Sequence, residues 1–99
     1  MRTYIYILKL LPQYQNGDNW DDEDSKTLEE HAGRLDRQKK RGVVKYVGKT
    51  DLPIDNEGNF GLVVFESESD EMAELFTQSD PAVLGNLMTA TCFPFKHIC

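Results

Sequence analysis

The sequence predicts an α+β domain in which two helices cover one face of a four-stranded antiparallel sheet. Four runs rich in β-branched and aromatic residues mark the strands. Apolar residues spaced three to four positions apart mark one helix between the first two strands and another between the last two. A chain of 99 residues is the size of one folding unit, so we expect a single domain over residues 1–99.

The first strand is expected over residues 3–11. Two interleaved sets of alternate positions, beginning at Tyr4 and at Ile5, are mostly apolar, so both faces of this strand should contact apolar surfaces. The following residues 12–19 include Pro, Gly, Asn and Asp, which are typical of a loop.

The first helix is expected over residues 22–41. Its inward stripe consists of Leu28, Ala32 and Leu35, and His31 falls on the same stripe. An imidazole therefore stands where most helices carry Leu or Ala.

Charged residues mark both ends of this helix. Asp24 and the capping box Thr27-x-x-Glu30 are competing N-caps, and Gly42 stands at the C′ position. The helix macrodipole favours acidic residues at the start and basic residues at the end, as found here in Asp21, Asp22, Glu23 and Asp24 and in Arg37, Lys39, Lys40 and Arg41. Both clusters thus read as solvated helix ends rather than as a metal site or a nucleic-acid patch.

The second half of the chain begins with a predicted hairpin. Strands are expected over residues 43–50 and 59–66, joined by the turn-rich residues 51–57. A short helix is then expected over residues 69–78, with Ser67 or Ser69 as its N-cap.

A further turn and a last strand complete the predicted fold. Asp80 followed by Pro81 is typical of a helix start, and this turn should stop near Gly85. The last strand is expected over residues 86–95, where Pro94 indicates an edge strand or a strand end.

The resulting order β-α-β-β-α-β is the ferredoxin-like plan, with two helices on one face of the sheet. The first and third strands are apolar on both sides, so the face left open by the helices would be a large apolar surface. We therefore expect a homodimer that pairs through this sheet face, of the dimeric α+β barrel type.

Composition argues against several classes of partner and location. A net charge of −6 disfavours nucleic-acid binding, which needs a basic face. The longest apolar stretch, residues 4–11, is interrupted by Lys9, so neither an export signal nor a membrane span is expected. The two cysteines form no C-x-x-C motif and predict no disulfide framework, which suits a cytoplasmic protein. Small molecules and other protein chains are the expected partners.

Two apparent motifs do not support a cofactor or a metal. Gly48, Lys49 and Thr50 resemble the end of a nucleotide-binding P-loop, but the first glycine of that motif is replaced by Val43 and no helix follows. The histidines and cysteines do not have the spacing of metal ligands; they are His31, His97, Cys92 and Cys99. We expect no cofactor and no metal.

His31 and Asp80 are the chemically distinctive residues, although each has a structural explanation. An inward histidine is often a core residue bonded to a backbone carbonyl. Asp80 before Pro81 is explained as a helix cap.

A resemblance to a known family adds to this interpretation. His31, Gly48, residues 61–66 and residues 79–83 resemble the pattern of the YCII-related (YciI-like) family, and the similarity extends over residues 3–95. The resemblance implies that His31 and Asp80 are a candidate active-site pair.

Such a pair is physically plausible in the predicted fold. Both helices lie on one face of the sheet, so an inward residue of the first helix could meet the segment after the second helix. A carboxylate bonded to one imidazole nitrogen fixes the tautomer, and the other nitrogen can then exchange a proton near pH 7. With no acyl nucleophile expected beside the pair and no cofactor loop, cofactor-free chemistry of the lyase or isomerase type is left, such as elimination, isomerisation or lactone chemistry. The resemblance implies small cyclic or aromatic acids and quinols as the substrates.

This sequence departs from the family pattern at two places that could shape a pocket. Lys49 follows Gly48 where the family often has Pro, and the connection over residues 12–24 is long. The candidate pocket-lining residues are Tyr6, Trp20, Tyr46, Gly48 and Lys49.

Two other functions remain open from the sequence. The chain could be a non-catalytic module in a homodimer that binds a small ligand, in which case His31 should tolerate Asn or Gln. It could also be a cofactor-independent oxygenase, which would need a cavity for a large aromatic substrate.

Overall fold

The computed structural model describes residues 1–99, apart from the side chain of Asp18. Its elements follow the predicted order, with two short 3₁₀ helices in the first loop and one turn of helix before the last strand. They are β1 (Arg2–Leu10), η1 (Pro12–Tyr14), η2 (Gly17–Asn19), α1 (Asp22–Lys40), β2 (Val44–Lys49), β3 (Gly61–Ser67), α2 (Asp70–Gln78), α3 (Pro81–Leu84) and β4 (Met88–Pro94).

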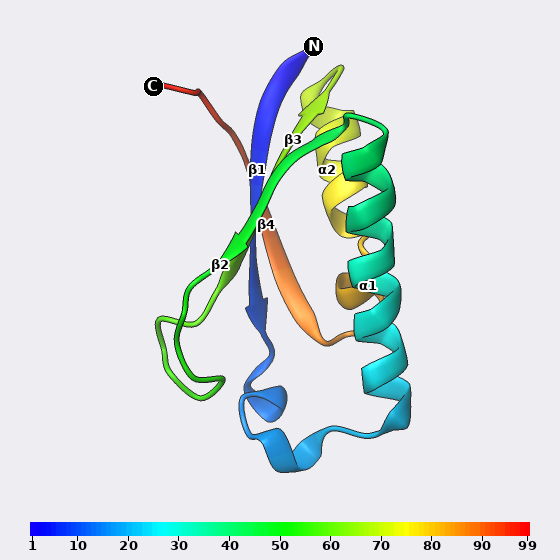
Figure 1. Ribbon diagram of the computed structural model, residues 1–99, viewed down its shortest axis with the longest axis vertical. Helices are drawn as coiled ribbons and strands as arrows, with labels where there is room; N and C mark the ends of the chain where they lie inside the picture. The colour runs from blue at the N-terminus through cyan, green and yellow to red at the C-terminus, as the bar shows by residue number, and fades with distance from the viewer.

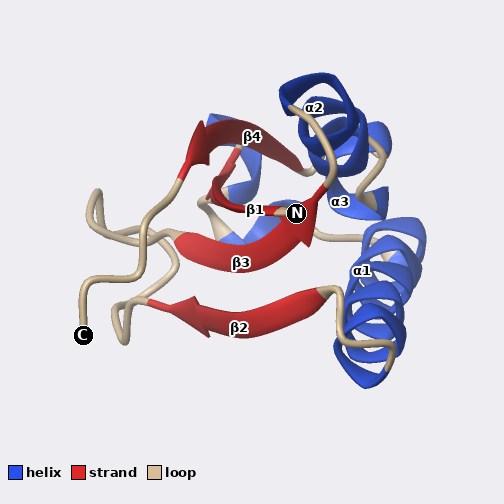
Figure 2. Cartoon of the chain, turned by 90° about the horizontal axis from the view of Figure 1, so that it is seen from above, coloured by secondary structure: helices blue, strands red, loops and turns tan.

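The four strands form one antiparallel sheet in the order β2-β3-β1-β4 (Figure 2). The predicted hairpin of β2 and β3 is therefore confirmed, and β4 is an edge strand that ends at Pro94, as expected from that proline. In the centre of the sheet Tyr6 of β1 lies opposite Val63 of β3 and Cys92 of β4.

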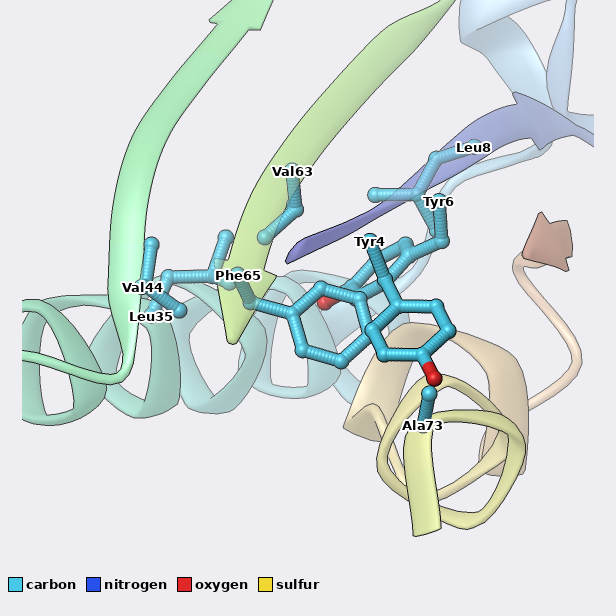
Figure 3. Close-up of a cluster of buried hydrophobic side chains, with 8 residues drawn as sticks. All are labelled: Tyr4, Tyr6, Leu8, Leu35, Val44, Val63, Phe65 and Ala73. Atoms are coloured by element: carbon cyan, nitrogen blue, oxygen red, sulfur yellow. The ribbon is translucent and has the colours of Figure 1, made fainter. Parts of the chain in front are cut away.

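All three α-helices lie on the same face of the sheet (Figure 1). The predicted α+β fold with helices on one face is thus confirmed. The alternate residues of β1 that begin at Tyr4 point into the core between sheet and helices (Figure 3). The buried cluster comprises Tyr4, Tyr6, Leu8, Leu35, Val44, Val63, Phe65 and Ala73.

The start of α1 differs from the prediction. Asp21 is the N-cap, and its side chain accepts a hydrogen bond from the backbone of Asp24 while the Asp24 side chain accepts one from the backbone of Asp21. Asp24 is thus the second half of a capping box, and Thr27 lies inside the helix. At the other end Gly42 occupies C′ with φ of 82°, as predicted.

The inward stripe of α1 is narrower than predicted. His31 and Leu35 are buried, but Ala32 is exposed and Leu28 is 38% exposed. The helix packs mainly against α3 and the edge strand β2, and its buried residues are those at positions 31 and 35. Each residue of an α-helix is rotated by about 100° from the one before it, so the side chain of Ala32, next to His31, points away from the line through these two positions.

The other face of the sheet carries apolar side chains that the chain covers only partly. Ile5, Ile7 and Val64 are half-buried, whereas Phe93 is 49% exposed. The segment after β4 runs on this side, away from the helices (Figure 2). None of the helices in the described part of the chain is long and apolar enough to cross a membrane.

Candidate active site

Asp80 occupies the sharp connection between α2 and α3. It caps α3, and its Oδ1 atom accepts a hydrogen bond from the backbone N–H of Ala82 at 2.9 Å. Pro81 follows at the first helical position, where its missing N–H costs nothing. The cap explains why the sequence turns here, but the side chain is also completely buried, which a cap at the protein surface would not require.

His31 reaches this carboxylate from α1. Its Nδ1 atom lies 2.6 Å from Oδ1 of Asp80, although the two residues are 49 positions apart in the sequence. His31 as a whole residue is 9% exposed and lies in the contact between α1 and α3. The structure thus brings together the two residues that the sequence singled out, and their catalytic role stays a prediction.

Tyr6 provides a further donor to the same carboxylate. Its hydroxyl donates to Oδ2 of Asp80 at 2.6 Å, and the side chain is fully buried. Tyr6 was expected to line a pocket, but it lies in the core beside Phe65, with ring centroids 5.6 Å apart. Its link to Asp80 was not predicted, because strand alternation shows that Tyr6 points inward but not which group its hydroxyl meets.

Arg34 lies one turn after His31 and was not predicted from the sequence. Its Nη2 atom donates to the backbone oxygen of Phe76 at 2.7 Å, and its guanidinium lies 4.2 Å from the centroid of the Phe76 ring. Its Nη1 atom is 3.9 Å from Oδ2 of Asp80 and is buried without a hydrogen-bond partner among the described residues. The spacing of three from His31 is the one sequence signal that could have placed Arg34 beside the pair.

The surroundings of Asp80 favour its ionised form. Burial alone would raise the pKa of this carboxyl, but the hydrogen bonds from His31 and Tyr6, the charge of His31 and the Ala82 amide together bring the pKa below its usual range. Burial and the adjacent Asp80 carboxylate raise the pKa of Tyr6 well above that of a free tyrosine. Tyr6 therefore remains a protonated donor to an ionised acceptor.

This charge state determines the tautomer of His31. An ionised carboxylate only accepts hydrogen bonds, so the Nδ1 atom of His31 must carry the proton that points to Asp80. In the neutral ring the lone pair is then on Nε2, which can accept a proton from another molecule.

His31 also lines a cavity of about 530 Å³ between α1 and the β2–β3 end of the sheet. Trp20, Gly48 and Lys49 line it as expected, whereas Tyr6 and Tyr46 do not. Tyr46 is 60% exposed because it pairs with Val64 on the opposite face of the sheet. The other lining residues are mainly apolar: Leu8, Leu10, Leu28, Leu35, Val47, Ile54, Asn59, Phe60, Gly61, Leu62, Val63 and Met88.

The titratable side chains that the structure describes do not gather elsewhere in a way that suggests a metal centre. Within the part of the chain whose side chains are described, no three His, Cys, Asp or Glu residues are grouped as metal ligands would be. Both cysteines are free thiols.

Comparisons with known proteins connect this geometry to a family. The model of the YCII-related domain matches residues 4–96. One similar solved structure is the 5-chloro-2-hydroxyhydroquinone dehydrochlorinase TftG from Burkholderia phenoliruptrix AC1100, in complex with 2,5-dihydroxybenzoquinone. It is 15% identical, with a TM-score of 0.60 over 96% of this chain and 94% of that one, and so is similar in fold. No curated protein matches the chain. Because the family model covers nearly the whole sequence, this protein belongs to the YCII-related family.

Proposed function

We propose that this protein is an enzyme that catalyses cofactor-free proton transfer on a small cyclic or aromatic compound, with His31 and Asp80 as its active-site pair. The observation that carries the proposal is the 2.6 Å contact between the Nδ1 atom of His31 and Asp80, made at the wall of an apolar cavity. A histidine oriented by a buried carboxylate is a suitable general base and general acid.

The proposed reaction begins with transfer of a substrate proton to the Nε2 atom of His31. The electron pair left on the substrate then forms a double bond. In an elimination a leaving group departs from the neighbouring atom with its bonding electrons, and His31 returns the proton to it or to solvent. In an isomerisation His31 returns the proton to a different carbon. Asp80 touches no substrate atom, and as a positioning residue it stabilises the imidazolium that forms between the two proton transfers.

The cavity supports a small ring compound as the substrate. Its volume of about 530 Å³ is within the range of small-molecule sites, and its wall is mainly apolar. The similar solved structure is named a dehydrochlorinase and holds a compound with one six-membered ring. Elimination on a substituted hydroquinone or quinone is therefore the first reaction to test.

The test is a comparison of His31→Gln with wild type on a panel of halogenated and hydroxylated hydroquinones, followed by ultraviolet absorbance and halide release. We expect His31→Gln to lower kcat/KM by about 10²-fold or more, which is the usual contribution of general acid–base catalysis. His97→Gln is the matched control, because His97 is exposed and outside the cavity. Full activity of His31→Gln would exclude the proposed mechanism.

A non-catalytic ligand-binding module is the alternative. The observation that favours it is the small exposure of His31, whose side chain is 11% accessible. In that case wild type should turn over none of the panel, while its ligands bind to both wild type and His31→Gln with a modest difference in affinity.

We also propose a homodimer through the sheet face opposite the helices. Ile5, Ile7 and Val64 stay half-buried there and Phe93 is about half exposed, which is unusual for a surface that meets only water. Light scattering at micromolar concentration should give the mass of two chains. Ile7→Lys, at the centre of this face, should shift the protein to monomer, whereas Thr3→Lys at its margin should not. A wild-type monomer at these concentrations would exclude the dimer.

A further inference from the structure

We infer that the cavity selects an anionic ring compound that carries a hydroxyl group, with Lys49 binding the anion and Asn59 binding the hydroxyl. This inference rests on the proposed function in taking the cavity as the ligand site. It adds which chemical groups the ligand must carry and which residues determine the preference for those groups.

The described wall of the cavity has few polar groups, and those that can be charged are basic. Among the residues whose side chains the structure describes, no Asp or Glu lines it, and Lys49 is the one lining residue besides His31 that can be positively charged. Trp20 also lines the cavity, but its indole N–H is already donated to the backbone oxygen of Tyr14 at 3.0 Å. Among the described side chains, a ligand therefore meets three available polar ones, those of His31, Lys49 and Asn59.

Lys49 is an unpaired cation at this wall. It ends β2 opposite Gly61, it is exposed, and it forms no ion pair with any residue whose side chain is described. The chain as a whole carries a net charge of −6, but charges more than roughly 10 Å away are screened by salt. Of the described side chains that line the cavity, Lys49 places a cation at the wall and none places an anion there, so the lining favours a carboxylate or a phenolate.

Asn59 presents an unused hydrogen-bonding group. Its Oδ1 atom is buried and accepts no hydrogen bond from any described residue, although its backbone N–H is held by Asn56 at 3.0 Å. A buried carbonyl without a partner destabilises a fold, and such exceptions are expected where a ligand supplies the partner. A hydroxyl group both donates and accepts, so it would satisfy the amide in either of its two orientations.

The apolar remainder of the wall suits a flat ring whose substituents these two polar side chains bind. Leu35 and Val63 are buried core residues that also line the cavity, and Phe60 and Met88 contribute further apolar surface. Binding of two substituents of the ring by these residues would determine which edge of the ring is turned toward His31, so Lys49 and Asn59 would be specificity-determining residues.

The experiment uses three test compounds that differ by one group each. They are 4-hydroxybenzoate, benzoate, which lacks the hydroxyl, and 4-hydroxybenzamide, which lacks the charge. Binding is followed by ¹H–¹⁵N NMR through the indole N–H of Trp20, the single tryptophan, and the amides of Gly48 and Gly61. We expect 4-hydroxybenzoate to bind most tightly. 4-Nitrophenol, compared above and below its ionisation, shows whether a phenolate also binds.

Two variants separate the roles of the two residues. Lys49→Met should weaken 4-hydroxybenzoate by roughly fivefold at low salt, as for a solvent-exposed ion pair, and leave 4-hydroxybenzamide unchanged. Asn59→Leu should bind 4-hydroxybenzoate and benzoate equally, and should unfold at a higher temperature because it removes an unpaired buried carbonyl. Lys45→Met is the matched control, since Lys45 lies on the same strand but pairs with Glu66 at 3.2 Å, outside the cavity.

Equal affinity of wild type for the three benzoate-derived compounds, or no binding of any of them, would overturn the inference. So would the same affinity for 4-hydroxybenzoate in Lys49→Met and Lys45→Met. His31→Gln separates this inference from the proposed function, because it should keep the preference for 4-hydroxybenzoate even if no reaction is ever found. A retained preference for 4-hydroxybenzoate without any catalysis would support the ligand class and reject only the proposal that the protein is an enzyme.

Discussion

Tyr6 and His31 donate hydrogen bonds to different oxygens of one buried carboxylate. The Tyr6 hydroxyl is 2.6 Å from Oδ2 of Asp80, and His31 Nδ1 is 2.6 Å from Oδ1. The backbone N–H of Ala82 adds another donor to Oδ1. Because these donors come from β1, α1 and α3, Asp80 joins the sheet to two helices, and the fold and the candidate site depend on the same group.

Removing the Tyr6 hydroxyl should therefore destabilise the protein. We expect Tyr6→Phe to lower the free energy of unfolding by about 1–3 kcal/mol, because Oδ2 of a buried carboxylate loses its nearest donor while the ring still packs. Urea denaturation followed by circular dichroism measures the change. Tyr4→Phe is the matched control, since the Tyr4 hydroxyl donates at 2.5 Å to Asp70, whose side chain is exposed and remains solvated. An equal loss in both variants would contradict the special role of Asp80.

The ionisation of Asp80 should appear in the pH dependence of stability. The pKa of this carboxyl is lowered in the folded state, so its ionisation stabilises the fold above the ordinary carboxyl pKa of about 3.9 and this contribution is lost as the pH falls through the folded-state value. Wild type should be more stable than Asp80→Asn at pH 7, and the difference should shrink below about pH 4. Urea denaturation of both proteins from pH 2 to pH 7 tests this. A difference that grows on acidification would show that Asp80 is protonated in the fold at neutral pH.

Gly85 permits the close approach of α3 to α1. A Cβ atom at this position would lie 2.7 Å from Cγ2 of Thr27 in α1 and 3.0 Å from the backbone oxygen of Pro81. We expect Gly85→Ala to destabilise the fold by about 1–3 kcal/mol through overpacking and to disturb the contact between His31 and Asp80. The measurement is the unfolding free energy together with the ¹⁵N shifts of the His31 ring.

The same contact offers a rescue. Thr27→Ser removes the Cγ2 methyl and keeps the hydroxyl that donates to the backbone oxygen of Glu23 at 3.0 Å. Thr27→Ser combined with Gly85→Ala should recover part of the lost stability in a double-mutant cycle. Strictly additive effects would place the strain at Pro81 rather than between the helices.

Arg34 should matter more than its neighbours on α1. Arg34→Met removes the hydrogen bond to the Phe76 oxygen and the guanidinium above the Phe76 ring, so we expect a loss of about 1–3 kcal/mol. Arg37→Met, an exposed arginine one turn later, should change stability by less than about 0.5 kcal/mol. Thermal and urea denaturation of the two variants show whether Arg34 contributes more to stability than an exposed arginine does.

Much of the fold could be predicted because its signals are local. The alternation that begins at Tyr4, the charges at both ends of α1 and the glycine at position 42 each reflect interactions between residues two to four apart. Asp80 before Pro81 likewise predicted a helix cap, which the structure confirms. Where two local signals competed, as at the start of α1, the sequence pointed to Asp24 or Thr27 and the cap is Asp21.

The candidate site depended on contacts that no local pattern contains. His31 and Asp80 are 49 positions apart, and Tyr6 and Asp80 are 74 apart, so their hydrogen bonds exist only once α1 and α3 pack on the same face of the sheet. The family resemblance could nominate the pair, but it could not show that Tyr6 and Arg34 adjoin it. The sequence by itself therefore determined the order of strands and helices and the cap at Asp80. Only the tertiary structure decided which side chains surround that carboxylate, because those contacts arise from packing between elements and not within them.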